Sequence, residues 1–317
     1  CSLEENIEEI DVKNLIRNEV QRLDKIIENT DLIENKNKKT KKELQKDELI
    51  KNLVIATDNF VVNRPNFGLH TLIAGYPWFL DWGRDTCIAF EGIVLLTKRY
   101  DIAKEIIKTM TRDVKYGLVP NGYSGYDNRP LYNSVDASLL LFESVNKYLK
   151  YTGDYQFIKE EIYPVLENII ENYCKGIDVS ENNIYLDIDG LIVSGTENTQ
   201  NTWMDVKFSG KAVTPRNGKA VEVNSLWYNA NKIMEKLSIK FGHLISAKRY
   251  KELAKQCKKA FEEKFYNQEN KCLYDVLGDS KIRPNQLFAL SLTYPVLEPN
   301  SEKAKNIIKI VEKKLLN

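Results

Sequence analysis

The segment 75–86, GYPWFLDWGRDT, gathers two tryptophans, two aspartates and an arginine within twelve residues. A loop that only joins two helices rarely holds so many large polar and aromatic side chains. Arg84 beside Asp85 can act as a donor and acceptor pair for the vicinal hydroxyls of a sugar, and a sugar can stack on the rings of Trp78 and Trp82. We favour a functional role for the Arg84–Asp85 pair. The two tryptophans are as consistent with closing the end of a helical fold as with binding a sugar.

A second segment with potential chemistry spans residues 200–222, QNTWMDVKFSGKAVTPRNGKAVE. Asp205 follows Trp203 and Met204, and an apolar setting disfavours an ionised carboxyl and raises its pKa. A general acid needs such a pKa, and glycoside hydrolysis uses a second carboxyl to activate water or attack carbon. We therefore predict Asp205 as a general acid. Glu222, at the start of the next helix, is more consistent with a structural or supporting role, because a carboxylate is favoured at a helix N-terminus.

Asp136 ends a third such loop, residues 122–136, GYSGYDNRPLYNSVD. It falls at the first turn of a predicted helix, where the helix dipole stabilises a carboxylate, and this accounts for most aspartates in such places. Its position behind a loop rich in tyrosine and asparagine keeps a ligand-contacting role open. Tyr132 and Asn133 are weaker candidates of the same kind.

Helices must carry these loops, because apolar residues recur every three to four positions on either side of them. Helical patterns are predicted over 12–27, 43–60, 86–100, 101–116 capped by Asp101, 135–149 capped by Ser134, 154–173, 220–241 and 246–265, and from residues 284 and 301. Residues 183–194, around Asp189-Gly190, predict a short β-hairpin, and residues 64–83 and 196–217 predict loops. Long loops within a compact domain are usually functional. We therefore expect an all-α fold of helical hairpins whose functional loops gather at one end.

The composition excludes several classes of function. The chain has 46 Lys and Arg against 45 Asp and Glu, a formal net charge of +1, so nothing in its charge favours a nucleic acid or an anionic membrane as partner. Two histidines, His70 and His243, exclude a site built from several histidines, and no metal or cofactor is expected. Five scattered cysteines predict reduced thiols in a cytoplasmic protein.

Four segments occur in a recognisable order: GYPWFLDWGRDTCIAFEG, YNSVDASLLLF, NTWMDVKFSGKAVTPRNGKAVEVNSLWYNA and RPNQLFALSL. Together they resemble the C-terminal amylo-α-1,6-glucosidase domain of glycogen-debranching enzymes, from about Leu44 to the end of the chain. The W-G-R-D and T-W-M-D stretches, with T-P-R-x-G-K-A-V-E behind them, are specific in combination. The resemblance implies an (α/α)6 barrel similar to that of glucoamylases. It also implies hydrolysis of α-1,6-linked glucose stubs with inversion and without a cofactor.

The same resemblance implies roles for single residues. Arg84 and Asp85 are expected to hold hydroxyls of the terminal glucose, and Asp205 is expected to be the general acid. Four further positions match family residues that line the site, namely Trp82, Asp136, Trp203 and Arg216. The implied substrate is a polysaccharide such as glycogen, limit dextrin or a malto-oligosaccharide.

The family pattern continues beyond Asn317, and the general base is expected there. We therefore expect a glucosidase domain over 41–317 that is incomplete at its C-terminal end, and an open barrel that exposes apolar helix faces. Residues 1–40 are expected to be the end of a preceding domain and a linker helix. Such a fragment is expected to be inactive when its second carboxyl is missing.

Two alternative functions remain open at this point. A carbohydrate-binding module without catalysis would use the arginine, aspartate and tryptophans equally well, and another inverting α-glucosidase would share the same barrel. A helical-repeat scaffold is disfavoured because the helices share no repeated unit of about 34 to 40 residues. Asp205 distinguishes the first alternative, since a pure binder would keep its affinity when this carboxyl is removed.

Overall fold

A computed structural model describes residues 11–33, 39–65, 67–76, 79–124 and 129–316 of the chain. Within them helices dominate, as the sequence predicts. The helical elements are α1 (Val12–Asn29), α2 (Lys41–Asp58), α3 (Gly83–Phe90), η1 (Glu91–Leu95), α4 (Tyr100–Arg112), α5 (Ala137–Thr152), α6 (Tyr155–Phe157), η2 (Ile158–Ile162), α7 (Tyr163–Lys175), α8 (Val221–Phe241), α9 (Leu244–Lys264), η3 (Pro284–Leu287), α10 (Phe288–Ser291) and α11 (Glu302–Leu315). The predicted all-α fold class is confirmed.

The strands are short and pair locally. They are β1 (Val61–Arg64), β2 (Leu69–Gly75), β3 (Phe79–Asp81), β4 (Gly122–Tyr123), β5 (Pro130–Leu131), β6 (Tyr185–Leu186), β7 (Ile192–Val193), β8 (Lys207–Phe208), β9 (Lys211–Ala212), β10 (Tyr266–Asn267) and β11 (Cys272–Leu273). β1, β2 and β3 form one antiparallel sheet, and the others pair as two-stranded hairpins. The hairpin predicted over 183–194 is present as β6–β7.

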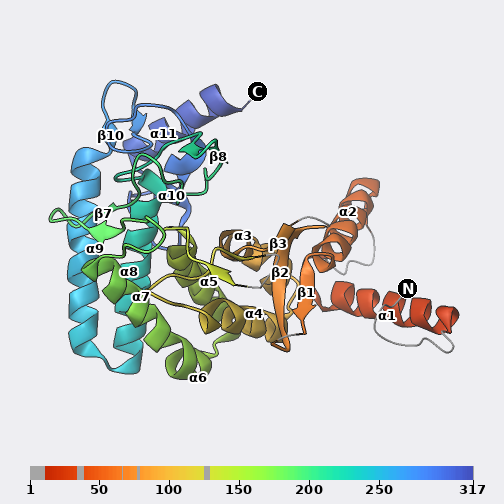
Figure 1. Ribbon diagram of the computed structural model, residues 1–317. Helices are drawn as coiled ribbons and strands as arrows, with labels where there is room; N and C mark the ends of the chain where they lie inside the picture. Colours follow the sequence, from red (N-terminus) through yellow and green to blue (C-terminus); the bar gives the residue numbers. More distant parts are fainter. Residues whose placement is uncertain (1–10, 34–38, 66, 77–78, 125–128, 317) are drawn as a thin grey trace.

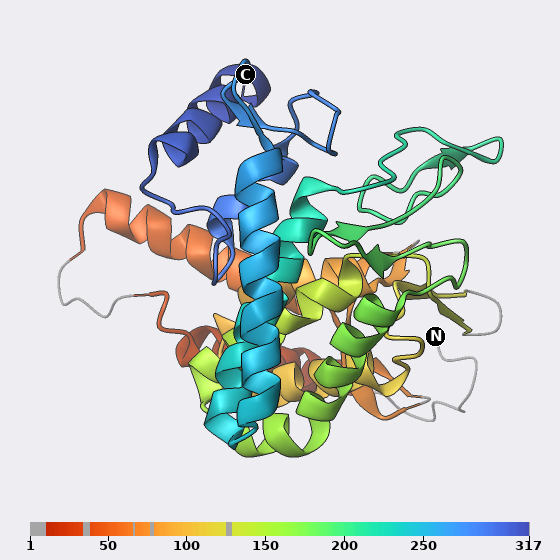
Figure 2. The ribbon, with the colours of Figure 1, turned by 90° about the vertical axis from the view of Figure 1, so that its left-hand side faces the viewer.

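The molecule has two arms that meet at an angle (Figure 1). Helices α7, α8 and α9 form one arm, the sheet β1–β3 with α1 and α2 forms the other, and α3, α4 and α5 lie between them. α8 and α9 run side by side as an antiparallel hairpin (Figures 1 and 2). Gly242 joins them in the left-handed conformation, with φ at +83°, which a glycine adopts without strain. The expected helical hairpins therefore exist, and the sheet is packed against α3 and α4.

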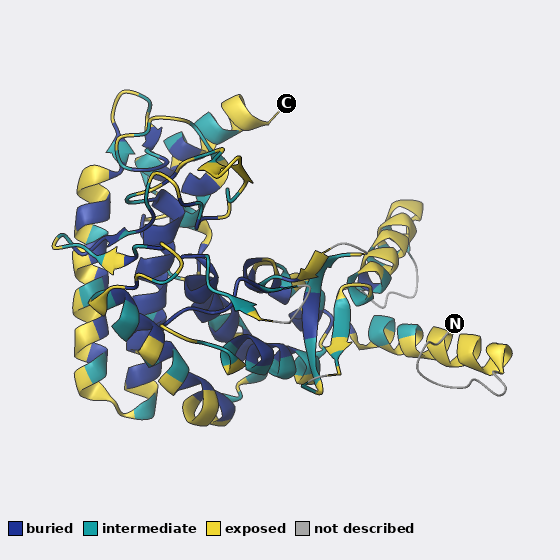
Figure 3. Cartoon of the chain, in the orientation of Figure 1, coloured by how far each residue is buried: buried dark blue, intermediate teal, exposed yellow. Residues whose placement is uncertain are grey.

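The core is centred on α5 and α8, which pack against each other. Both helices are buried on nearly all sides, as the dark blue ribbons of Figure 3 show. A helix surrounded by other elements loses the polar face of a surface helix, and this is why SLLLFESV of α5 reads as an almost unbroken apolar run. α9 keeps an exposed outer face and buries only one stripe. The core thus fixes the start of α5 and of α8, where candidate site residues lie.

Some predicted boundaries were wrong for identifiable reasons. The expected helix 86–100 is split, because a π-helical turn and a left-handed Lys98 follow α3. Asp101 lies inside α4 rather than capping it, and that helix ends at Arg112 instead of Tyr116. Ser134 does not cap α5; its N-cap residue is Asp136, whose side chain makes no capping hydrogen bond. Asp154 and Ser301, where helices were predicted to begin, are the N-cap residues of α6 and α11.

Two predicted loops contain strands. Residues 64–83 include β2 and β3, and β8–β9 interrupts the loop 196–217. The sheet is built from VVNR and LHTLIAG, which hold β-branched residues on either side of a turn that passes through Gly68 at φ +62°. These β-branched residues indicated strands, but the aromatic residues that follow them led to the prediction of a loop. No helix of the described segments has both the length and the apolarity that a bilayer crossing requires.

Candidate active site

Arg84 is the centre of the polar site. It lies in the first turn of α3, is almost fully buried, and binds two carboxylates at once. Its Nε donates to Asp136 Oδ2 at 2.8 Å and its Nη1 to Asp205 Oδ2 at 2.9 Å. Gly83 permits this placement, since a Cβ at that position would overlap the backbone oxygen of Pro120. The start of α3 is thereby held against the segment that leads to α5.

Asp136 comes to Arg84 from the N-terminus of α5. Its side chain is free for this contact because it does not cap its own helix. Oδ1 of Asp136 and Nη2 of Arg84 are both buried, and neither has a hydrogen-bond partner among the described residues. Buried polar atoms are rarely left unpaired. The pair therefore presents one acceptor and one donor that a bound molecule can satisfy.

Asp205 reaches the same guanidinium group from the loop between β7 and β8. The apolar surroundings predicted from Trp203 and Met204 are not what its carboxylate contacts. Its oxygen accepts from Arg84, and its side chain is 34% exposed. The structure thus unites two residues 121 positions apart, while the role of Asp205 as general acid stays a prediction.

Asp85 lines a cavity of about 670 Å3 next to Arg84. Partial removal from water at the cavity wall raises the pKa of the Asp85 carboxyl above its ordinary value. Arg84 opposes this rise in pKa, and the nearby carboxylates of Asp205 and Asp136 add to it. A carboxyl with these surroundings takes up a proton more readily than a solvated aspartate.

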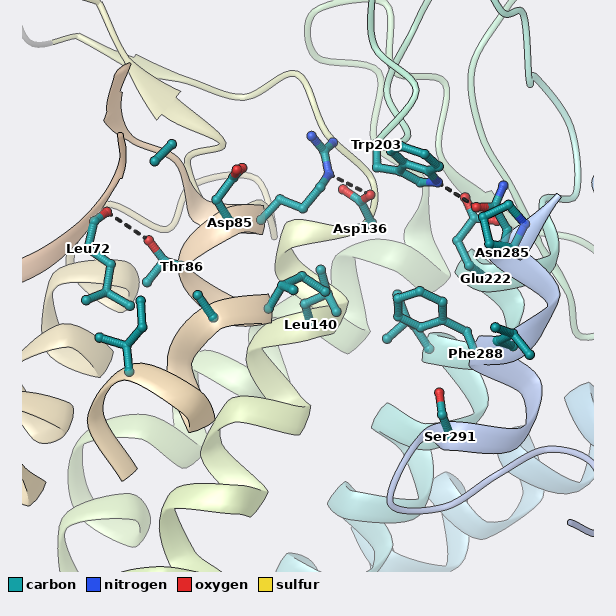
Figure 4. A pocket seen from close by; sticks show the side chains of 18 of the residues that line it. Leu72, Asp85, Thr86, Asp136, Leu140, Trp203, Glu222, Asn285, Phe288 and Ser291 are labelled. Atoms are coloured by element: carbon teal, nitrogen blue, oxygen red, sulfur yellow. Dashed lines mark hydrogen bonds and ion pairs between the residues drawn. The ribbon is translucent and has the colours of Figure 1, made fainter. Parts of the chain in front are cut away.

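The cavity has a polar rim and an apolar interior (Figure 4). Asp85, Asp136, Trp203 and Glu222 follow the rim, and Leu140 and Phe288 lie below them. Other apolar lining residues come from the turn between α2 and β1 and from β2, α3, η1, α8 and η3: Phe60, Leu72, Ile73, Ile88, Ile93, Leu226 and Leu287. A cavity of this size with a few polar groups at one end is typical of a small-molecule site.

Glu222 and Arg216 exchange the places predicted for them. Glu222, expected to be a supporting residue, lines the cavity, whereas Arg216, expected to line it, is buried behind Glu222. Arg216 binds both carboxylate oxygens of Glu222, and its Nε donates to Asp275 Oδ2 at 2.8 Å. Burial raises the pKa of Glu222, and Arg216 opposes that shift. The guanidinium of Arg216 is fully engaged within the protein, so its position suits orienting Glu222.

Trp82, also predicted to line the site, lies elsewhere. Trp82 packs against Gly122 and lines a separate small cavity together with Asp81 and Tyr123. Trp78 falls outside the described residues. Trp203 does line the main cavity, with its indole 44% exposed. Of the two predicted tryptophans that the structure describes, Trp203 lies at the cavity rim and Trp82 does not.

Sequence reasoning missed two residues that complete this region. Asn285, on η3, lines the cavity and accepts a hydrogen bond from Trp203 Nε1 at 2.7 Å. Asp275 is buried between Arg216, Arg283 and Asn285. Asn285 lies in the R-P-N-Q stretch that carried part of the resemblance, which was a usable signal. Asp275 follows an ordinary short strand, and nothing local distinguishes it.

A family model described as amylo-alpha-1,6-glucosidase matches residues 55–317. This chain belongs to the amylo-alpha-1,6-glucosidase family. All the residues of the cavity rim lie within the matched range. The suspected resemblance is thereby confirmed at the level of the family, and the chain has a glycosidase fold and lineage.

Individual relatives of this amylo-alpha-1,6-glucosidase family chain agree. It is 26% identical over 232 residues to the glycogen debranching enzyme of Saccharomyces cerevisiae, an alignment that covers 56% of this chain and 15% of the yeast enzyme. Among solved structures, a rhamnosidase from Klebsiella oxytoca with rhamnose bound has a TM-score of 0.53 at 13% identity. That likeness covers 72% of this chain and 40% of the rhamnosidase.

A GH78 family rhamnosidase of Bacillus sp. GL1 also has a TM-score of 0.53, at 12% identity. The likeness covers 74% of this chain and 23% of that protein. At these identities the rhamnosidases share the fold of this family member, and the fold alone. The chain spans less than half the length of each of these three proteins.

Proposed function

We propose that this chain is the glucosidase part of a glycogen-debranching enzyme, which removes α-1,6-linked glucose stubs from glycogen or limit dextrin. Membership of the family and the name of the yeast relative support this reading. Three acids and one arginine line the cavity, so its charge favours a neutral polysaccharide over an anionic ligand. The four described cysteines are unpaired, which suits a reducing cytoplasm.

The observation that carries the proposal is the pair of free atoms on Arg84 and Asp136. Nη2 of Arg84 can donate to one hydroxyl of a terminal glucose, and Oδ1 of Asp136 can accept from a neighbouring hydroxyl. Asp85 can accept from a third hydroxyl at the rim. Vicinal hydroxyls are the chemistry that this arrangement of donor and acceptors fits. Trp203 adds an apolar face against which a pyranose ring can pack.

In the proposed reaction Asp205 donates its proton to the glycosidic oxygen as the bond to the anomeric carbon breaks. A water activated by a second carboxyl attacks the anomeric carbon from the opposite side, so that glucose leaves with inverted configuration. Glu222 is a poor second carboxyl because Arg216 binds both of its oxygens. We therefore propose that a carboxyl other than that of Glu222 activates the water.

The second candidate function is binding of an α-glucan without catalysis. The contact that favours it is the hydrogen bond from Arg84, which occupies one oxygen of the Asp205 carboxyl group. Asp205→Asn distinguishes the two functions, because the amide can still accept from Arg84 but has no proton to give.

The test uses the protein as its gene encodes it and a dextrin that carries single α-1,6-linked glucose stubs. We expect the wild type to release β-glucose, which proton NMR of the initial product detects. We expect Asp205→Asn to lose at least about a hundredfold in rate while dextrin affinity changes little, in line with the usual contribution of a general acid. Binding without glucose release by the wild type would establish the second function instead. Release of α-glucose would refute inversion.

A further inference from the structure

The R-P-N-Q stretch, residues 283–286, has no part in the proposed reaction, yet its Asn285 lines the cavity and its other polar side chains are held by neighbouring residues. Arg283 forms an ion pair with Asp275. Gln286 is buried and accepts from a backbone N–H of β11 at 3.1 Å. Asn285 lies between Asp275 and Trp203, as Figure 4 shows for its contact with the indole. The stretch therefore links the buried interior to an exposed ring at the rim.

The chemistry of its neighbours fixes the orientation of the Asn285 amide. A carboxylate only accepts hydrogen bonds, so Asp275 Oδ1 requires the Asn285 NH2 group, 2.7 Å away. An indole only donates, so Trp203 Nε1 requires the amide oxygen, also at 2.7 Å. Aspartate at position 285 would face Asp275 with a second carboxylate, and leucine would serve neither partner. Asparagine joins a group that only accepts to a group that only donates.

The other end of this chain of contacts is firmly anchored. Asp275 is buried and is held by both Arg216 and Arg283. Arg216 in turn forms an ion pair with Glu222, which lies in the first turn of α8, one of the most buried helices of the molecule. The acceptor offered to Trp203 is thus fixed to the core, although the indole itself is 44% exposed.

We propose that Asn285 is a positioning residue that fixes the Trp203 indole at the cavity rim and thereby the stacking surface for a sugar ring. The identity of the sugar, a residue of a neutral α-glucan, rests on the proposed function. A half-exposed ring on a loop has little packing to hold it, so its one N–H donor must set its direction. Asp205 lies two residues further along the same loop, so the same hydrogen bond also steadies the approach of that carboxyl. Fixing such a ring before binding lowers the entropy lost when ligand binds.

The positioning can be measured without any ligand. In protein labelled with 15N at the indole nitrogens, the Trp203 signal is the one that disappears in Trp203→Phe. We expect Asn285→Ser to move that signal and to speed its exchange with solvent. Serine is one atom shorter than asparagine, so its hydroxyl reaches neither the indole nor Asp275, and Asp275 keeps Arg216 and Arg283 as partners. Asn229→Ser is the matched control, because Asn229 is equally buried on α8 and bonds to Glu143 instead. An unmoved Trp203 signal in Asn285→Ser overturns the proposal.

The consequence for binding is tested by a double-mutant cycle on the dissociation constant for the stub-bearing dextrin. We expect Asn285→Ser and Trp203→Phe each to weaken binding, the former about fivefold, the order of one neutral hydrogen bond. In the Trp203→Phe background, Asn285→Ser should add almost nothing, because the donor is already gone. Equal effects of Asn285→Ser in both backgrounds would assign Asn285 a merely structural role and overturn the proposal.

Two further outcomes separate this inference from the proposed function. A wild type that binds no dextrin, combined with a Trp203 signal that moves in Asn285→Ser, refutes the proposed function and supports the positioning. A wild type that cleaves dextrin, combined with an unmoved Trp203 signal in Asn285→Ser, supports the proposed function and refutes the positioning. If Asn285→Ser does not fold, Trp203→Phe alone decides. It leaves the buried network intact, and a loss of affinity below twofold would overturn the proposal.

Discussion

Replacing Arg216 by methionine tests whether the buried ion pairs behind the cavity hold this end of the molecule together. The side chains of Arg216 and Glu222 are 1% and 2% exposed, and Asp275 is 1% exposed. Removing one partner of a buried pair leaves an uncompensated charge and costs about 3–5 kcal/mol. Asp275 keeps Arg283 and Asn285 as partners, so most of this destabilisation falls on Glu222. We expect Arg216→Met to lower the free energy of unfolding by that amount at pH 7.

The pH dependence of the same variant has a defined sign. Burial raises the pKa of Glu222 and Arg216 opposes it, so the pKa rises further without Arg216. A carboxyl whose pKa is higher in the folded than in the unfolded state stabilises the fold below its unfolded pKa. That contribution is lost as pH rises through the folded pKa. The deficit of Arg216→Met relative to wild type should therefore shrink as the pH falls from about 7 to about 5.

Urea unfolding followed by circular dichroism at both pH values measures these free energies. The double variant Arg216→Met and Glu222→Gln should be less destabilised than Arg216→Met alone, since glutamine leaves no unpaired charge buried at position 222. Arg22→Met is the matched control: the Arg22 side chain is 47% exposed, so its loss should cost about 0–1 kcal/mol. The reasoning is refuted if Arg216→Met costs no more than Arg22→Met, or if its deficit grows on acidification.

Two further predictions concern the rim. Wild-type affinity for dextrin should fall as the pH drops through the raised pKa of Asp85, because the protonated carboxyl is a weaker acceptor. Asp85→Asn should abolish that pH dependence and weaken binding roughly 10- to 100-fold at pH 7, the order of a hydrogen bond to a charged group. Titration calorimetry across the pH range measures both effects. Gly83→Ala should destabilise the fold by about 1–3 kcal/mol in urea unfolding, since the new Cβ meets the Pro120 backbone and displaces Arg84. Gly122→Ala, where the nearest atom is 3.3 Å away on a side chain, should cost clearly less.

The helices were predictable because apolar residues recur at helical spacing within each of them, and that periodicity is local information. Val12, Leu49 and Phe142 belong to apolar patterns whose spacing of three to four residues alone predicts a helix. The sheet β1–β3 was missed because its strands are short and their pairing depends on residues that follow in the chain. Asp136 shows the same limit at one residue: its sequence position fits a dipole-stabilised helix start, and only the fold reveals that its carboxylate turns to Arg84.

Sequence motifs could name some of the residues that meet at the candidate site, but not their arrangement. Motifs identified Arg84, Asp136 and Asp205, whose contacts span 52 and 121 residues of sequence. No spacing rule predicts which of them meet. Arg216 and Glu222 are six residues apart, and sequence placed the wrong one at the cavity, because the direction in which a loop residue points depends on distant partners such as Asp275. Long-range pairing, rather than propensity, decides these positions.

The rim is assembled where three helices begin. Asp85 lies in the first turn of α3, Asp136 is the N-cap residue of α5, and Glu222 lies in the first turn of α8. Helix N-termini carry partial positive charge and favour carboxylates, and Arg84 and Arg216 form ion pairs with Asp136 and Glu222, so the three acids can stand close together. The same arrangement would repel an anionic ligand and leaves hydroxyl groups as suitable partners for the unpaired donor and acceptor. Three helix starts therefore supply the acids of the rim, and the loop that carries Trp203 and Asp205 completes the site beside them.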